Sequence, residues 1–121
     1  MSKKRLLIID DDPRNIFALV NTLRARSFDC LSCLSAEEAL RLLSTDEIID
    51  AVLIDMMMPE MDGYDAIPII KAIPSRRFTY VVAVTAQAMP GDKEKCLEAG
   101  ADAYISKPVD VDKLLLILSE I

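Results

Sequence analysis

Acidic residues follow two of the apolar runs in this chain of 121 residues. L-L-I-I leads directly into Asp10 and Asp11, and A-V-L-I leads directly into Asp55. An apolar run that ends in a carboxylate is typical of a buried strand that carries an acid to the edge of a sheet. In open α/β sheets, that carboxyl edge is where ligands bind. We therefore expect Asp55 to be a nucleophile, and we expect the rest of the chain to support its reaction.

Three carboxylates close together need a positive partner. At about 4 Å, one pair of like charges costs roughly 4 kcal/mol at an effective dielectric constant near 20. A ligand set of oxygens only selects a hard cation, and Mg²⁺ accepts one or two protein carboxylates together with waters and phosphate oxygens. The pattern predicts a Mg²⁺ site at Asp10, Asp11 and Asp55, with Lys107 supplying the remaining positive charge.

A carboxylate beside Mg²⁺, a lysine and a hydroxyl suits phosphoryl transfer, which depends on positioning and charge neutralisation more than on acid–base chemistry. Asp55 would attack phosphorus and become an acyl phosphate. Lys107 would hold one phosphoryl oxygen, and Thr85 would donate a hydrogen bond to another. Because the chain has no histidine, the phosphoryl donor must be another protein or a small phosphodonor.

Five apolar segments alternate with helical patterns, which predicts an α/β fold. The expected architecture is a flavodoxin-like (βα)5 doubly wound sandwich with a parallel five-stranded sheet in the order 2-1-3-4-5. In that order the first and third strands are neighbours, so their acids meet. The expected strands are Lys4–Asp10, Phe28–Leu34, Asp50–Asp55, Tyr80–Val84 and Ala103–Ser106.

The helices are expected after Asp12-Pro13, after Ser35, over Tyr64–Ile73, from Pro90-Gly91-Asp92 to Leu97, and after Asp110. Asp12, Ser35 and Asp110 are typical N-cap residues. Proline beyond the first turn removes a hydrogen bond and clashes with the carbonyl four residues earlier. Pro68 therefore predicts either a late start or a kink in the third helix.

Composition favours one globular domain over residues 1–121. The net charge of −6 and the pI near 4.6 argue against a nucleic-acid surface, which needs clustered Lys and Arg. Neither a signal peptide nor an apolar stretch long enough to span a bilayer is evident, so a cytoplasmic location is expected. Cys30 and Cys33 should lie on opposite faces of one strand, which disfavours a chelating or redox pair. Cys96 fits buried apolar packing.

In order and spacing, these residues resemble the response-regulator receiver domain of two-component signalling over nearly the full chain. The matching features are Asp10-Asp11, Asp55 in D-M-M-M-P-E-M-D-G, Thr85-Ala86 and Lys107-Pro108. Each is weak alone, and together they are specific. Three further segments are most similar to receivers attached to hybrid histidine kinases. They are D-D-D-P-R-N-I-F-A-L, T-A-Q-A-M-P-G-D-K-E-K-C-L-E-A-G-A-D-A-Y and K-P-V-D-V-D-K-L-L.

The resemblance implies a role for each site residue. Asp11 would ligate Mg²⁺ directly and Asp10 would assist, while Asp55 and the backbone carbonyl of Met57 would complete the protein ligands. Mn²⁺ is the alternative ion. The Lys107–Pro108 peptide bond would be cis. Tyr104 would be the switch aromatic, turning inward when Thr85 moves toward the phosphoryl group. Met57 and Gln87 are expected to influence the lifetime of the acyl phosphate.

The resemblance also implies a signalling function without turnover of external substrates. The domain would take a phosphoryl group from a histidine kinase or a histidine phosphotransfer protein and hydrolyse it slowly, and a parent hybrid kinase would be an enzyme. Neither nucleic acid nor membrane would be bound directly. A weak homodimer through the face formed by the fourth helix, fifth strand and fifth helix is a further expectation.

Two other functions fit part of the pattern. A dehalogenase-type phosphatase would use Asp10 as nucleophile and Asp12 as acid–base, although that family usually has Thr or Val where Pro13 stands. A nucleotide or flavin carrier would need a glycine-rich or hydroxyl-rich phosphate loop after the first strand, where D-D-D-P-R-N would repel phosphate. Mapping an acid-labile phosphoryl adduct separates these functions.

Overall fold

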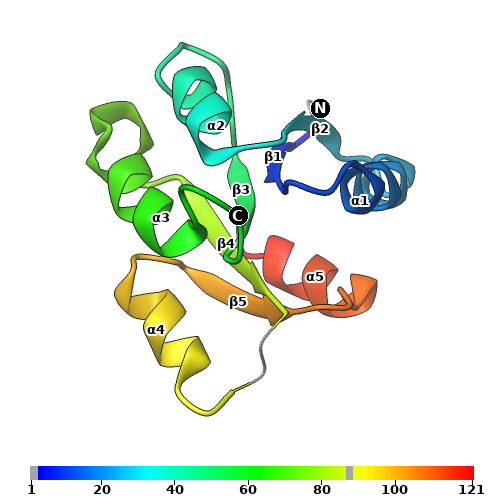
Figure 1. Cartoon of the computed structure of the whole chain (residues 1–121). Helices are drawn as coiled ribbons and strands as arrows, with labels where there is room; N and C mark the ends of the chain where they lie inside the picture. Colours follow the sequence, from blue (N-terminus) through cyan, green and yellow to red (C-terminus); the bar gives the residue numbers. More distant parts are fainter. Residues whose placement is uncertain (1–2, 87–88) are drawn as a thin grey trace.

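The computed structural model describes residues 3–86 and 89–121 (Figure 1). Within these residues, five parallel strands form one sheet in the order β2-β1-β3-β4-β5. The predicted topology is confirmed, and the strand ends differ from those expected by a few residues at most. The strands are β1 (Arg5–Ile9), β2 (Asp29–Cys33), β3 (Ala51–Asp55), β4 (Tyr80–Thr85) and β5 (Ala103–Ser106).

Helices cover both faces of the sheet, as Figure 1 shows. One apolar core lies between the sheet and α1 and α5, and a second lies between the sheet and α2, α3 and α4. In the part of the chain that the structure describes, no helix is both long and apolar enough to cross a bilayer. The helices are α1 (Pro13–Ala25), α2 (Ala36–Leu43), α3 (Gly63–Ala72), α4 (Asp92–Glu98) and α5 (Val111–Leu118), and a short 3₁₀ turn, η1 (Pro74–Arg76), follows α3.

Polar side chains start four of the helices. Each accepts a hydrogen bond from a backbone N–H in the first turn, which satisfies a donor that has no partner within the helix. The expected caps at Asp12, Ser35 and Asp110 are confirmed, and Asp62 caps α3 in the same way.

Pro68 does not delay the third helix. α3 begins at Gly63 and continues through Pro68 to Ala72, so the expected late start is wrong. Asp62 accepts a hydrogen bond from the Asp65 backbone N–H at 3.0 Å and so fixes the start of the helix ahead of the proline. The apolar face of α3 packs into the core through Ala66, Ile67 and Ile70. Tertiary packing therefore outweighs the local cost of the proline.

The strand register brings the predicted site residues to one edge. Ile9 of β1 pairs with Ile54 of β3, so Asp10 and Asp55 follow at the same level. Asp55 in turn pairs with Val84, which precedes Thr85. Thr85 pairs with Ser106, and Lys107 comes next in the chain. The three central strands and β5 thus end in the side chains from which the sequence predicted chemistry.

The cysteines behave as predicted. Cys30 and Cys33 are buried in different cores on the two faces of β2, and Cys96 is buried on the inner face of α4. All three are free of disulfide bonds. Burial, followed by the charge of Glu38, raises the pKa of the Cys33 thiol to about 12. This thiol is therefore protonated and unreactive near neutral pH.

One buried guanidinium joins the segment after α3 to the segment after α2. Arg76 of η1 is 6% exposed. Its Nε donates to the Leu43 carbonyl at the end of α2 at 2.9 Å, and its NH2 group donates to the carbonyls of Thr45 at 3.0 Å and Glu47 at 2.6 Å. Arg76 thereby holds the connection between α2 and β3 against the end of α3.

Candidate functional site

Three carboxylates converge at the carboxyl edge of β1 and β3. One oxygen from each of Asp10, Asp11 and Asp55 lies within 4.8 Å of the others. Asp10 and Asp55 are buried, whereas Asp11 is exposed. Two anchored carboxylates and one solvent-facing carboxylate form an all-oxygen donor set, which fits a hard divalent cation such as Mg²⁺ that also keeps bound water.

Lys107 bridges the two buried acids. Its Nζ lies 3.1 Å from Asp55 Oδ2 and 3.3 Å from Asp10 Oδ2. Burial acts to lower the pKa of Lys107, but the hydrogen bond and charge of Asp55, with those of Asp10, outweigh it and raise this pKa overall. Lys107 is therefore a permanent cation between the two carboxylates.

The loop after β3 holds the other oxygen of Asp55. The Met57 backbone N–H donates to Asp55 Oδ1 at 2.9 Å, while the Met57 side chain is 49% exposed. The loop returns on itself, because the Gly63 N–H donates to the Met56 carbonyl at 3.3 Å. A Cβ on Gly63 would lie 2.9 Å from Met56 Cα and would also collide with Met56 Sδ. Glycine is therefore required where the loop closes beside Asp55.

Asp10 and Asp12 have different environments. Asp10 Oδ1 accepts from the Asp12 backbone N–H at 2.8 Å, and Asp10 Oδ2 lies 3.5 Å from Asn15 Nδ2. Asp12 instead caps α1, and hydrogen bonds from the side chain and backbone of Arg14 lower its pKa. Asp12 therefore serves as the N-cap of α1 and as the partner of Arg14.

Thr85 and Tyr104 lie along the neighbouring strands. Thr85 is fully buried at the end of β4, and its carbonyl accepts from the Lys107 backbone N–H at 2.7 Å. The Lys107–Pro108 peptide bond is cis, as the resemblance implied. Tyr104 is half-buried on β5 and packs against the core under α3 and α4. Gln87 lies outside the described residues.

A cavity of about 520 Å³ opens beside the acids, between α1 and α5. Asp10, Asp55 and Lys107 line one part of it, and apolar side chains such as Leu19 and Leu53 line the rest. Asp55 is thus only 5% exposed yet borders open space. A small group such as a phosphoryl group can reach this carboxylate.

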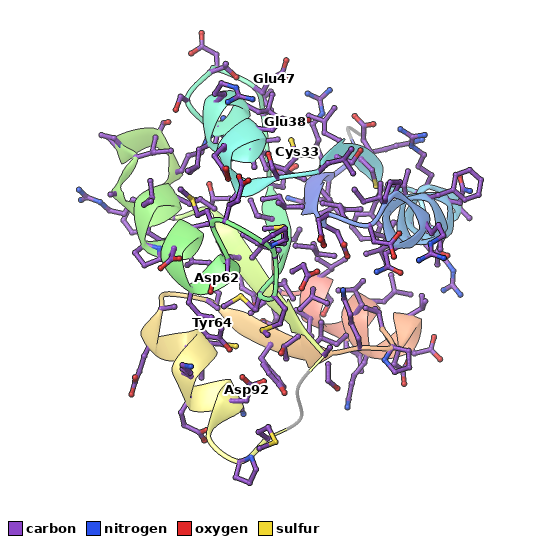
Figure 2. The ribbon with its side chains drawn as sticks, viewed as in Figure 1. Cys33, Glu38, Glu47, Asp62, Tyr64 and Asp92 are labelled. Carbon is purple, nitrogen blue, oxygen red and sulfur yellow. The ribbon has the colours of Figure 1, made fainter. Side chains whose placement is uncertain are left out.

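Sequence analysis missed one polar cluster on the other face of the sheet. Tyr64 and Asp92 lie where α3 and α4 approach each other (Figure 2), and the Tyr64 hydroxyl donates to Asp92 Oδ1 at 2.8 Å. The sequence pattern places Asp92 only in the helix start Pro90-Gly91-Asp92, and Tyr64 only at the start of the helix over Tyr64–Ile73. Neither residue carries a motif that could have revealed the contact.

Comparisons with known proteins agree with this geometry. The family described as the response regulator receiver domain matches residues 6–119. The chain is 36% identical over 109 residues to the signal transduction histidine-protein kinase BarA of Shigella flexneri, covering 90% of this chain and 12% of that protein. It is 32% identical over 112 residues to the polar-differentiation response regulator DivK of Brucella ovis, covering 93% of this chain and 90% of that one. The chain thus spans about an eighth of the kinase and most of the regulator.

A solved structure supports the same relationship. The receiver domain of the sensor histidine kinase PA1611 from Pseudomonas aeruginosa PAO1 superposes with a TM-score of 0.88 at 31% identity, covering 98% of this chain and 97% of that one. That structure has a magnesium ion coordinated in its active site cleft. In this chain the cluster of Asp10, Asp11 and Asp55 offers a donor set of the kind that such an ion prefers.

Proposed function

The chain belongs to the response regulator receiver domain family of two-component phosphorelay signalling, and from that premise we propose that Asp55 is its phosphoacceptor. One observation carries the proposal. Asp55 is a buried carboxylate 3.1 Å from the Lys107 ammonium, and it shares a 4.8 Å cluster with Asp10 and Asp11. Receiver domains are response regulators and are not generally classed as enzymes, so Asp55 carries the group and does not turn over an external substrate.

The proposed step is transfer from a phosphohistidine partner. A carboxylate oxygen of Asp55 forms a bond to phosphorus, while the phosphorus–nitrogen bond of the phosphohistidine breaks. The electron pair of that bond stays on the imidazole nitrogen, which takes up a proton. Lys107 hydrogen-bonds one phosphoryl oxygen, and the Thr85 hydroxyl donates to another. The domain then hydrolyses its own acyl phosphate slowly.

Asp10, Asp11, Asp55 and the backbone carbonyl of Met57 would hold Mg²⁺, with Mn²⁺ as the alternative ion. When bound, the ion supplies positive charge against the oxygens of the transferring phosphoryl group. The protein's own contribution is to hold the acids in place. Asp10 is fixed by the Asp12 N–H and Lys107, and Asp55 by the Met57 N–H and Lys107.

Thr85 and Tyr104 would report phosphorylation. The buried hydroxyl of Thr85 would move toward the phosphoryl group, and the Tyr104 ring would turn inward. Moving a two-state equilibrium from 1:99 to 99:1 needs about 5.5 kcal/mol of differential stabilisation. Charge-assisted hydrogen bonds from Lys107 and Thr85 to a group carrying about two negative charges are of suitable strength.

The proposed setting is a single domain over residues 1–121 in the cytoplasm, served by a histidine kinase or a histidine phosphotransfer protein. Direct contact with nucleic acid or membrane is not part of the proposal. A weak homodimer would use the face of α4, β5 and α5, where Leu97 and Leu116 are exposed. These statements concern this domain, and the activity of any larger protein that contains it is a separate proposal.

Adduct mapping tests the proposed function. We expect incubation with Mg²⁺ and phosphoramidate to add one phosphoryl group, mapped by mass spectrometry to the peptide that contains Asp55. An adduct on Asp10 would instead favour the phosphatase mechanism, as would multiple turnover of a phosphoester. Omitting Mg²⁺ serves as the control and should leave the protein unmodified.

Replacing Asp11 with Asn tests the metal site. The exposed ligand loses its charge while the two buried acids keep their contacts, so we expect Mg²⁺ affinity to fall at least about tenfold, which corresponds to 1.4 kcal/mol. Isothermal titration calorimetry measures it directly. Asp112→Asn removes another exposed acid, from the first turn of α5, and should leave the affinity unchanged. Equal affinities in both variants would remove Asp11 from the ligand set.

A further inference from the structure

Asp92, the first residue of α4, is a buried carboxylate that joins three separate elements. It is 6% exposed and lies on the face of the sheet that α3 and α4 cover (Figure 2). Its Oδ1 accepts from the Tyr64 hydroxyl of α3 at 2.8 Å, and its Oδ2 accepts from the Tyr104 hydroxyl of β5 at 3.4 Å. A single side chain therefore connects α3, α4 and the strand that carries the expected switch aromatic.

These hydrogen bonds have a charged acceptor in a buried place. A buried carboxylate is costly unless it is paired, and hydrogen bonds to ionised acceptors are about twice as strong as neutral ones. Burial raises the pKa of Tyr64 and of Tyr104, and the charge and hydrogen bonds of Asp92 raise both further. Both phenols therefore remain protonated donors near neutral pH.

Tyr64 is held against α4 by two more contacts. Lys95 Nζ lies 4.8 Å from the centroid of the Tyr64 ring, and Cys96 Sγ lies 3.8 Å from the Tyr64 hydroxyl. A cation over the face of an aromatic ring is attracted by the ring's negative face. Because Tyr64 is fixed in this way, it orients the Asp92 carboxylate. The second oxygen of that carboxylate accepts the hydrogen bond from Tyr104.

We propose that Asp92 and Tyr64 form a latch that retains the Tyr104 hydroxyl while Asp55 is an unmodified carboxylate bonded to Lys107, and that phosphorylation of Asp55 opens this latch. The inference rests on the proposed function, in which Asp55 accepts the phosphoryl group and Tyr104 moves. Asp92 acts as a positioning residue, since it contacts Tyr104 and not the reacting atoms. Thr85 pairs with Ser106 of β5, two residues after Tyr104, so displacement of Thr85 acts on the strand that carries the Tyr104 ring.

Titration with beryllofluoride in the presence of Mg²⁺ tests the latch, because beryllofluoride forms a tetrahedral adduct on a carboxylate that resembles a phosphoryl group. Asp92→Asn leaves one carbonyl oxygen for two phenols, and Tyr64→Phe removes the orienting donor. Both variants should bind beryllofluoride more tightly, by about tenfold for Asp92→Asn and about threefold for Tyr64→Phe, because the unmodified state loses hydrogen bonds that the opened latch does not make.

Two matched variants control for charge and for a lost hydroxyl. Glu94→Gln removes an exposed acid from the same turn of α4, and Tyr80→Phe removes a tyrosine hydroxyl from β4, outside the latch. Neither should change the affinity. In protein labelled with ¹³C at the tyrosine Cζ, Asp92→Asn and beryllofluoride should each shift the Tyr64 and Tyr104 resonances by more than the Tyr80 resonance. Disruption of the fold alone would not produce tighter binding of beryllofluoride together with larger ¹³C shifts at Tyr64 and Tyr104 than at Tyr80.

The outcomes separate the two proposals. Failure of the wild-type protein to bind beryllofluoride with Mg²⁺ would overturn the proposed function. Binding by the wild type together with unchanged or weaker affinity in the variants would overturn the latch alone. If Asp92→Asn fails to fold, Tyr64→Phe decides, because it keeps the buried carboxylate and its Tyr104 donor in place.

Discussion

Asp55→Asn should abolish the phosphoryl adduct while leaving the fold intact. The amide oxygen can still accept from the Met57 N–H, which bonds Asp55 Oδ1 at 2.9 Å. Lys107 keeps its contact with Asp10 at 3.3 Å. The nucleophilic oxygen, however, is replaced by an amide nitrogen whose electron pair is delocalised. With phosphoramidate and Mg²⁺, we expect adduct formation to fall at least about hundredfold, in line with the loss of a covalent nucleophile.

Mass spectrometry of the intact protein measures this loss, and circular dichroism checks the fold. Glu60→Gln is the matched control, because it removes an exposed acid from the same loop and should be phosphorylated like the wild type. Persistence of the adduct in Asp55→Asn would disprove the assignment of the phosphoacceptor. If that adduct mapped to Asp10, the phosphatase alternative would regain support.

Arg76→Met should be the most destabilising single substitution that we predict outside the apolar core. Methionine approximates the length of the side chain but leaves three carbonyl oxygens, those of Leu43, Thr45 and Glu47, without the guanidinium. An acceptor left unsatisfied costs about 1–3 kcal/mol when buried. Because water can replace part of the interaction at the more exposed residues, we expect the free energy of unfolding to fall by about 3 kcal/mol.

Urea denaturation followed by circular dichroism measures this free energy. Arg77→Met provides a closely matched control, since Arg77 is the next residue and is exposed, and it should change stability by no more than about 0.5 kcal/mol. Equal effects in the two variants would mean that the three hydrogen bonds of Arg76 contribute nothing specific.

The sequence was sufficient to predict the architecture and to nominate the residues at the sheet edge. Two acids after apolar runs, combined with the order 2-1-3-4-5, place Asp10 beside Asp55 through a register that period-two strands enforce. Lys107 was expected to balance their charge, and the structure gives it contacts with both acids. The placement of these side chains could be predicted because backbone hydrogen bonding and burial leave few alternatives for such strands.

Interactions between segments that are distant in the chain could not be predicted. Arg76 lies in what reads as a polar loop, and its partners stand 29 to 33 residues earlier. Pro68 suggested a disrupted helix start, yet Ile67 and Ile70 on either side of it are fully buried. The contact between Tyr64 and Asp92 spans 28 residues and depends on how α3 and α4 pack. No local propensity encodes such pairings.

The hydrogen bonds from Tyr104 and Tyr64 to Asp92 would, under the proposed latch, have a thermodynamic consequence for whatever binds the domain. Coupling between two sites is reciprocal: if phosphorylation changes the affinity for a partner, that partner changes the free energy of the phosphorylated state by the same amount. A protein that binds α3 or α4 and alters the hydrogen bonds of Asp92 would thus shift the phosphorylation equilibrium at Asp55 without contacting the acidic cluster. If Asp92 transmits the signal as proposed, the face of α3 and α4 is also one through which the receiver can be controlled.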